Sequence, residues 1–365
     1  MGIHLRSILL FANKLQSAPQ GGRELLCKLN YELLREIYGD RLVVFELPLR
    51  RSRRLRAIAD AFVGHIDGLS RAVMSDALLE IQKNGISKIF VDGSNLGKFA
   101  QTVKRNLPYV EVVTFFHNVE ARFFLGAFRH SRTLRAFAVL AANYLAERKA
   151  ARYSDKIICL NQRDSELLEK VYGRSASHLS PIALRDGCPS MPAFGGVQAE
   201  KYALFVGGAF YANRAGVKWF VEHVAPKIDI VTYIVGRGFE ALKQDLERNS
   251  KVRVVGAVDD LANWYRGSHL VIAPIFDGSG MKTKVAEALM FGKRIVGTPE
   301  AFVGYEDAGR SVGVACATPG EFIDAINRFA SEKWVEFDPQ LRALYEEKYS
   351  FSAAKARLIR ILEPA

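Results

Sequence analysis

The sequence of 365 residues lacks an apolar run long enough to span a bilayer. A transmembrane helix needs ~20 consecutive apolar residues, whereas the stretch 136–146 is short and is interrupted by Asn143. Near the N-terminus, the apolar run Ile8–Ala12 is not followed by a small-residue cleavage site, so it predicts a buried strand rather than a secretory signal. We therefore expect a cytoplasmic protein.

Metal-ligating patterns are also missing. The four cysteines, Cys27, Cys159, Cys188 and Cys316, lie far apart without a Cys-x-x-Cys pair, and the seven histidines are equally scattered. This spacing is typical of reduced, buried thiols and excludes a disulfide framework. No Asp-x-Asp pair occurs, so the sequence offers no such ligands for a metal-bound diphosphate. We expect neither a metal nor a bound cofactor.

Acidic residues are too few to balance the basic ones in only one half of the chain. Residues 1–190 hold 29 Lys and Arg against 18 Asp and Glu, whereas residues 191–365 hold 22 against 21. Five of the basic residues cluster at Arg50, Arg51, Arg53, Arg54 and Arg56. An anionic membrane surface, a nucleic acid and a solvated basic face all remain open as explanations. Because no nucleic-acid reader motif occurs, a nucleic acid is not expected as a partner.

Strands alternate with helices along the chain. In the first half, β-branched runs at 42–47, 88–91 and 110–116 alternate with helical periodicity at 24–38, 57–83 and 132–153. Such alternation predicts parallel sheets covered on both faces. Pro and Gly crowd into 180–200 as in a linker, and the alternation then restarts. The sequence therefore predicts two Rossmann-like domains, 1–185 and 197–345, followed by a terminal helix within 346–365.

Four predicted strands end at residues that suit a ligand. In open α/β sheets, ligands bind at the carboxyl ends of strands, where helix N-termini point backbone N–H groups outward. A lone glycine pair means little, because strand-to-helix turns use glycine in any case. Several such ends within one domain indicate a binding edge. The four ends are Gly207 with Gly208, Gly236 with Gly238, residues 277–280, and His117 with Asn118.

One segment of the second half is the richest in such residues. Gly278 and Gly280 let the backbone approach a ligand, and the predicted helix after them offers its positive end to phosphate. Lys282 and Lys284 place two cations in the first turn, which is unfavourable unless an anion is bound there. This pattern favours a diphosphate site. Glu287 would accept hydrogen bonds from ribose hydroxyls; the alternative is an ordinary surface glutamate.

The residues from Glu287 onward carry a family resemblance. Residues 287–298 read EALMFGKRIVGT, which resembles the donor-domain motif of retaining glycosyltransferases of family 4 with the GT-B fold. That motif is E-x7-E; Glu287 matches its second glutamate, whereas Ser279 stands at the first and Asp277 lies two residues earlier. The preceding GSGMKTK is similar to the family branch that reads GSG-x-[RK]-x-K. The resemblance implies two Rossmann-like domains facing a central cleft, and a C-terminal helix in 346–365 that crosses back to the first domain.

Other stretches follow in the order of the family. Residues 205–219 resemble the first donor-domain strand, whose glycine pair approaches the diphosphate with help from a basic residue. Residues 256–261 resemble the segment whose backbone faces the nucleobase, and a glycine-rich loop near the N-terminus also faces the donor. The donor-binding positions that the resemblance implies are Gly21, Gly22, Gly207, Gly208, Arg214, Lys218, Val258, Gly280, Lys282, Lys284 and Glu287.

His117 ends an apolar strand and has two interpretations. It could be a satisfied core residue; the resemblance instead implies that it lies at the interdomain cleft, opposite residues 278–284. There it would bind the donor sugar or stabilise the departing diphosphate by electrostatic catalysis. Asp92, Ser94 and Asn95 end the preceding strand and would line an acceptor pocket, the alternative being a capping turn.

A basic and aromatic stretch follows in the first half. Phe123, Phe124 and Phe128 precede Arg129, Arg132 and Arg135, and these arginines precede the apolar stretch 137–145. Basic, aromatic surfaces of this kind suit peripheral binding to anionic lipid, here on the inner face of the membrane. A buried helix beside a solvated arginine face is the alternative.

The resemblance implies a retaining, metal-independent glycosyltransferase of the hexosyltransferase type. It would move a sugar from a nucleoside diphosphate donor to a glycan or lipid-linked acceptor, as in polysaccharide biosynthesis. Two other functions stay open. A GT-B-fold sugar-nucleotide epimerase would need paired carboxylates facing the sugar, and the sequence shows few of them. A catalytically silent nucleotide-sugar-binding subunit is favoured only by the missing first glutamate.

Overall fold

The computed structural model describes residues 7–16, 22–48, 54–188, 201–278, 280–306 and 313–363. The chain forms two compact units, one of Met1–Pro181 with Ala354–Ala365 and one of Ile182–Ala353. Within the described ranges, no helix combines the length and the apolarity that crossing a bilayer would require.

The first unit is built on a parallel sheet of six strands in the order β2-β1-β3-β4-β5-β6. The interior strand β1 is wholly buried, as its uninterrupted apolar sequence predicts for a strand covered on both faces. The strands are β1 Ile8–Ala12, β2 Leu42–Glu46, β3 Lys88–Asp92, β4 Glu111–Phe116, β5 Lys156–Cys159 and β6 His178–Leu179.

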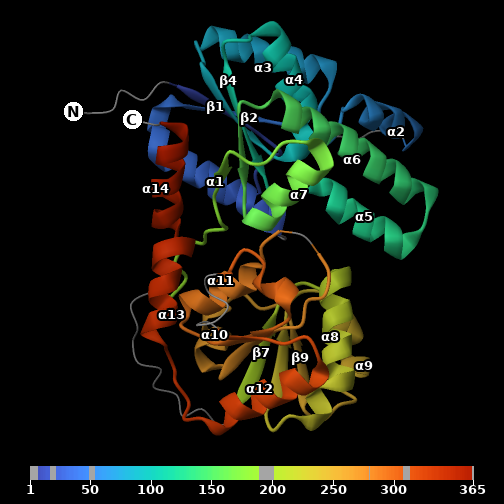
Figure 1. Ribbon diagram of the computed structural model, residues 1–365, viewed down its shortest axis with the longest axis vertical. Coiled ribbons are helices and arrows are strands. Elements are labelled where there is room, and N and C mark those ends of the chain that lie inside the picture. Colours follow the sequence, from blue (N-terminus) through green and yellow to red (C-terminus); the bar gives the residue numbers. More distant parts are fainter. Residues whose placement is uncertain are drawn as a thin grey trace. The chain divides into compact units, whose positions relative to one another are not determined.

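Helices connect these strands (Figure 1). In α1 the buried side chains recur every three to four residues, so one apolar stripe packs on the sheet. The helices of this unit are α1 Gly22–Tyr38, α2 Arg54–Val63, α3 Arg71–Lys83, α4 Gly97–Asn106, α5 Glu120–Ser131, α6 Leu134–Tyr153 and α7 Gln162–Tyr172. The last helix of the chain, α14 Phe351–Leu362, returns to this unit, where Lys88 forms an ion pair of 2.8 Å with Glu363.

The single helix expected over 57–83 is wrong, because the chain breaks into α2 and α3 between them. Gly64 and Gly68 have φ values of 98° and 89°, and a Cβ at Gly68 would lie 2.2 Å from the carbonyl oxygen of Pro48. These backbone angles suit glycine and stop a helix. Ser70 then caps α3 by accepting a hydrogen bond from Val73 N.

The second unit repeats the architecture with six parallel strands in the order β12-β11-β10-β7-β8-β9. Its strands are β7 Tyr202–Val206, β8 Val231–Val235, β9 Val252–Gly256, β10 Leu270–Ala273, β11 Ile295–Gly297 and β12 Gly313–Ala315. Its helices are α8 Tyr211–His223, α9 Lys243–Leu246, α10 Ala262–Gly267, α11 Thr283–Met290, α12 Pro319–Ser331 and α13 Pro339–Leu344. The predicted fold class, two α/β units with parallel sheets, is confirmed.

Candidate functional site

Two neighbouring glycine loops lie at the carboxyl ends of β7 and β8 in the second unit. Gly207 N donates to the carbonyl of Val235 at 2.9 Å, and Ala209 N donates to that of Arg237 at 2.9 Å, so the loops run side by side. A Cβ at Gly236 would lie 1.9 Å from the carbonyl oxygen of Gly207. Only glycine permits this approach, which forms a glycine edge, a stretch of backbone without side chains at Gly207, Gly208 and Gly236.

Lys284, on α11, reaches under this edge. Its Nζ is 3.1 Å from Oδ1 of Asn213 and 4.1 Å from the ring centroid of Phe205. A Cβ at Gly207 would lie 3.2 Å from the same Nζ. Burial lowers the pKa of Lys284 to about 7, while the nearby Glu287 acts in the opposite direction. A buried ammonium directly below a glycine loop is suited to hold phosphate oxygens.

Glu287 lies one turn after Lys284 and is partly buried. Its Oε2 accepts a 2.5 Å hydrogen bond from the Tyr265 hydroxyl, and Tyr265 stacks on Phe291 with ring centroids 5.0 Å apart. Burial raises the pKa of Glu287, whereas Tyr265 and Lys284 act to lower it. The carboxylate is therefore held in one position with an oxygen that can accept hydrogen bonds from a ligand.

Lys282 differs from its neighbour two residues on, because it has an anionic partner in the protein. Its Nζ forms an ion pair of 3.1 Å with Glu300 and donates to the carbonyl of Gly280 at 2.9 Å. Of the two lysines, Lys284 is therefore the one that favours a bound anion.

The other predicted donor positions do not all lie at the carboxyl edge of the second sheet. Gly208 belongs to the glycine edge, and Val258 follows β9 at its carboxyl end. Arg214 and Lys218 are exposed on α8, and Gly22 is the first residue of α1 in the other unit. Gly21 and Ser279 lie outside the described residues. The sequence did not indicate Asn213, Phe205 or Tyr265, which contact Lys284 and Glu287 from other elements.

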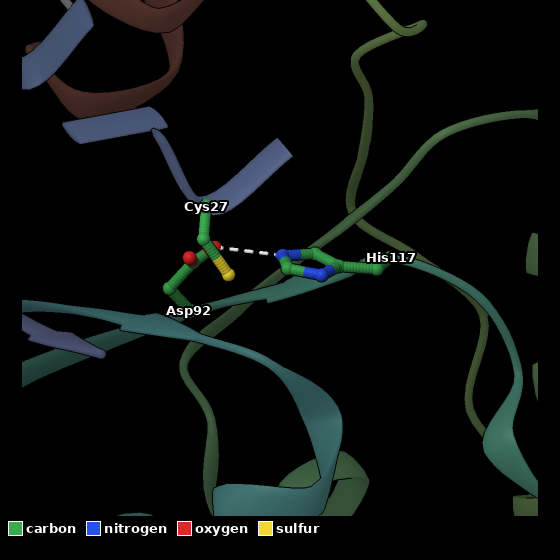
Figure 2. A group of neighbouring side chains, drawn as sticks. All are labelled: Cys27, Asp92 and His117. Atoms are coloured by element: carbon green, nitrogen blue, oxygen red, sulfur yellow. Dashed lines mark hydrogen bonds and ion pairs between the residues drawn. The ribbon is translucent and has the colours of Figure 1, made fainter. Parts of the chain in front are cut away.

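In the first unit, His117 lies at the carboxyl end of β4 and is buried. Its Nε2 is 2.8 Å from Oδ1 of Asp92, which also accepts a 2.8 Å hydrogen bond from Nδ2 of Asn30 (Figure 2). The Asp92 side chain is 0% exposed. Although burial alone would raise it, the contact with His117 brings the pKa of Asp92 below its ordinary value. The predicted acceptor residue Asp92 is therefore the group that orients the imidazole.

Cys27 completes this group. Its sulfur and the ligand atoms of Asp92 and His117 all lie within 4.8 Å of one another (Figure 2). Burial, and then the Asp92 carboxylate, raise the pKa of the Cys27 thiol far above its usual range. Within the described part of the chain, this is the group of side chains that could hold a metal ion.

Ser94 and Asn95 contact other side chains of the first unit. Ser94 donates to Oε1 of Glu147 at 2.9 Å. Asn95 donates to Asp67 at 2.6 Å and accepts from Arg23 at 3.1 Å, and Arg23 forms an ion pair of 2.9 Å with Asp67. Arg23 and Asp67 also line a cavity of about 540 Å³, together with Asn13, Lys14, Glu24 and His65. This cavity, absent from the sequence predictions, could take a polar ligand.

Glu147 caps the start of α5, the helix that follows His117. Its carboxylate accepts hydrogen bonds from the backbone N–H groups of Glu120 and Ala121 at 2.9 and 3.1 Å, which are the first donors of α5. The Tyr172 hydroxyl donates to the same carboxylate at 2.7 Å. Burial raises the pKa of Glu120 to about 7.

Comparisons with known proteins agree with this architecture. Residues 200–332 match the family described as Glycosyl transferases group 1. No curated protein matches the sequence.

Among solved structures, the chain is similar to sucrose-phosphate synthase from Thermosynechococcus elongatus, with a TM-score of 0.73 and 14% identity over 98% of each chain. It is similar to HepE from Anabaena, solved with UDP-glucose, with a TM-score of 0.69 and 12% identity over 98% of this chain and 100% of that chain. It is also similar to the lipopolysaccharide outer core galactosyltransferase WaaB, with a TM-score of 0.61 and 11% identity over 97% of this chain and 99% of that chain. Residues 200–332 therefore form a glycosyl transferases group 1 domain, in a chain with the fold of GT-B glycosyltransferase structures.

Proposed function

We propose that this protein is a glycosyltransferase that moves a hexose from a nucleoside diphosphate donor to a glycan or lipid-linked acceptor, with retention and without a metal. The observation that carries the proposal is the buried Lys284 ammonium beneath the Gly207 edge, one turn before Glu287, in a glycosyl transferases group 1 domain. Uridine is the nucleoside we favour, because the similar HepE structure holds UDP-glucose.

In this proposal the second unit binds the donor. Lys284 and the backbone of the glycine edge hold the diphosphate, while Glu287 accepts hydrogen bonds from the ribose hydroxyls. The diphosphate gains negative charge as it departs, so a buried cation that is already in position stabilises the transition state. The family resemblance is what supports retention, and the lack of an Asp-x-Asp pair favours a metal-free reaction.

The first unit would supply His117 and the acceptor-binding surface. The Asp92 contact holds the imidazole in one orientation, as a donor to a developing negative charge requires. The cavity bounded by Arg23 and Asp67 offers charged and polar groups to an acceptor that carries hydroxyls.

The surface of α5 and α6 suggests where a lipid-linked acceptor is met. Leu134 and Phe137 are 89% and 54% exposed, and the nearby Arg129, Arg132 and Arg135 are also exposed. The beginning of α6 is therefore not a buried helix, and we propose that it attaches peripherally to an anionic membrane. Arg50, Arg51 and Arg53 lie outside the described residues.

The test is incubation of the pure protein with UDP-, GDP- and dTDP-hexoses, followed by analysis of nucleotides and sugars. We expect slow hydrolysis of one donor without added metal, and loss of ~1–3 kcal/mol of UDP binding in Glu287→Ala, the scale for hydrogen bonds to a charged group. Formation of an epimer would instead support the epimerase, and binding without turnover the silent subunit. Unchanged UDP affinity in both Glu287→Ala and Lys284→Ala contradicts the donor site.

A further inference from the structure

The Cys27 thiol has no role in the proposed glycosyltransferase reaction, yet it lies against Asp92 and His117. Cys27 comes from α1, Asp92 from the end of β3, and His117 follows β4, so three separate elements bring a sulfur, a carboxylate and an imidazole together. The three side chains point toward one another (Figure 2). We propose that this cluster binds a thiophilic divalent cation, with Zn²⁺ as the best match.

The spacing of the ligand atoms suits a tetrahedral ion. Zinc–ligand bonds of ~2.0–2.3 Å place neighbouring ligand atoms roughly 3.3–3.8 Å apart. The present atoms all lie within 4.8 Å of one another, with His117 Nε2 and Asp92 Oδ1 at 2.8 Å. Small side-chain rotations that open this hydrogen bond would therefore be enough to admit the ion.

An unused acceptor atom points to a ligand. Oδ2 of Asp92 is fully buried and makes no hydrogen bond within the described residues, a state that proteins usually avoid. Asn30 holds the other oxygen of the same carboxylate at 2.8 Å. This is the outer-shell support that metal-binding carboxylates commonly have.

The chemical identity of the ligands selects the kind of cation. Sulfur and imidazole nitrogen favour zinc and similar transition metals, whereas Mg²⁺ and Ca²⁺ take oxygen ligands. A cysteine thiolate and a carboxylate carry two negative charges, which a divalent ion neutralises inside the buried site. Binding requires that the Cys27 thiol gives its proton to the solvent.

An ion also needs a way in and a fourth ligand. Cys27 lines the cavity of about 540 Å³ in the same unit, next to Arg23 and Glu24. The ion would enter from this cavity and complete its tetrahedron with a water molecule on that side. A consequence rests on the proposed function: an ion bound to Nε2 would withdraw His117 from the donor sugar, so Zn²⁺ would inhibit the transferase.

The direct test uses Co²⁺ as a spectroscopic probe of the metal-free, full-length protein. Co²⁺ in a tetrahedral site with a thiolate gives intense visible bands and a sulfur-to-cobalt charge-transfer band. We expect both bands at one equivalent of Co²⁺, and their loss when Zn²⁺ is added. Absence of the charge-transfer band in the wild-type protein overturns the proposal.

Variants of the protein side chains identify which of them bind the metal ion. Cys27→Ser keeps the size of the side chain but removes the thiol, so the charge-transfer band should disappear. Cys159→Ser is the matched control, because Cys159 is another fully buried thiol of the first unit, and the band should persist. Thermal melting confirms that each variant is folded, and Asp92→Asn serves as the second ligand variant. A band that survives in Cys27→Ser, or that disappears only in Cys159→Ser, overturns the assignment.

A kinetic arm separates this inference from the proposed function. Zn²⁺ should inhibit donor turnover of the wild-type protein, and at least tenfold more Zn²⁺ should be needed in Cys27→Ser, each measured against its own metal-free rate. If no donor is turned over while the Co²⁺ bands appear, the proposed function fails and the metal site stands. Turnover without the bands gives the opposite result.

Discussion

At the scale of single residues, Lys284 carries a positive charge that its surroundings disfavour. Its ammonium is buried between Phe205 and the Gly207 edge, and the polar contact that holds it is Asn213. A charge taken out of water is costly unless an opposite charge compensates it. This cost lowers the pKa of Lys284 to about 7. A bound diphosphate would supply the opposite charge and stabilise the ammonium.

This situation predicts a pH dependence of UDP binding. Because the diphosphate favours the protonated lysine, binding above pH 7 must take up a proton, whereas below pH 7 the proton is already present. We expect UDP affinity to fall by up to about tenfold per pH unit above 7, where the terminal phosphate of UDP is already ionised. Calorimetry in buffers of different ionisation enthalpy measures both the affinity and the proton uptake.

Lys284→Met should weaken UDP binding and abolish this slope. Lys293→Met is the matched control, since burial also lowers the pKa of Lys293 to about 7, but its Nζ donates to the carbonyls of Arg266 and Ser268. A slope that persists in Lys284→Met, or that disappears in Lys293→Met, shows that another group takes up the proton.

The sequence places single residues well only where position along a strand determines them. The glycine edge could be predicted because Gly207 follows β7 directly and parallel strands end at one edge. Tyr265 and Asn213 could not, because they approach Glu287 and Lys284 from α10 and α8 across the fold. Likewise Glu300 neutralises Lys282 from a distant segment, which spacing along the chain does not reveal.

At the scale of elements, α5 and α6 form a pair of helices that lie side by side (Figure 1). Arg132 has a left-handed backbone with φ of 49° and ends α5, and Thr133 caps α6. Exposed apolar side chains at the start of α6 thus lie beside three exposed arginines. Leu134, Phe137 and Val139 are exposed together near the start of α6, at 89%, 54% and 37%, so they form an apolar patch of the kind that meets a partner surface.

This surface predicts binding to anionic vesicles. Replacing Arg129, Arg132 and Arg135 by glutamine should lower vesicle binding by about 1 kcal/mol for each arginine near the membrane. Leu134→Ser with Phe137→Ser should also lower it. Leu79→Ser is the matched control, because Leu79 is 61% exposed on α3. Co-sedimentation measures the binding, which added salt should weaken because exposed charges are screened over ~10 Å at 0.1 M.

If the wild-type protein does not bind anionic vesicles at low salt, this surface is not a membrane-binding site. Equal losses in Leu79→Ser and in the α6 variant would show a general effect of surface polarity.

Sequence periodicity predicted most strands but fewer of the helices, because it indicated neither α4 nor α5 and joined α2 to α3. Most strand segments are apolar runs whose burial leaves little choice of structure, although β2 at the edge of its sheet is only partly buried. The break between α2 and α3 depends on the close approach of Gly68 to Pro48, a contact between distant segments. The start of α4 is similar, because a Cβ at Gly97 would lie 2.2 Å from the carbonyl oxygen of Ala146 on α6. Helix limits that depend on tertiary contacts are not encoded in local periodicity.

At the scale of the whole molecule, two α/β units could be predicted because the alternation of strands and helices is interrupted once and then restarts. The segment 180–200, rich in proline and glycine, is the interruption, so each series was expected to build its own parallel sheet. The two sheets with their separate strand orders confirm this. The activity could be predicted only through the resemblance of residues 287–298, because many functions share such folds.

The last prediction concerns a division of the reaction between the two units. If the second unit binds the nucleotide and His117 of the first acts on the sugar end, His117→Ala should lower turnover by about 10²–10³-fold, the range for one well-placed electrostatic donor. UDP affinity should stay nearly the same, in contrast to Lys284→Met.

Asp92→Asn tests the positioning role, because it keeps a side chain of the same size beside the imidazole but removes the charge that orients it. It should lower kcat with little change in donor KM. Turnover and thermal stability measured on the same preparations distinguish these roles from a structural one. Near-wild-type turnover with a lower Tm in His117→Ala would make His117 a core residue and remove it from the reaction.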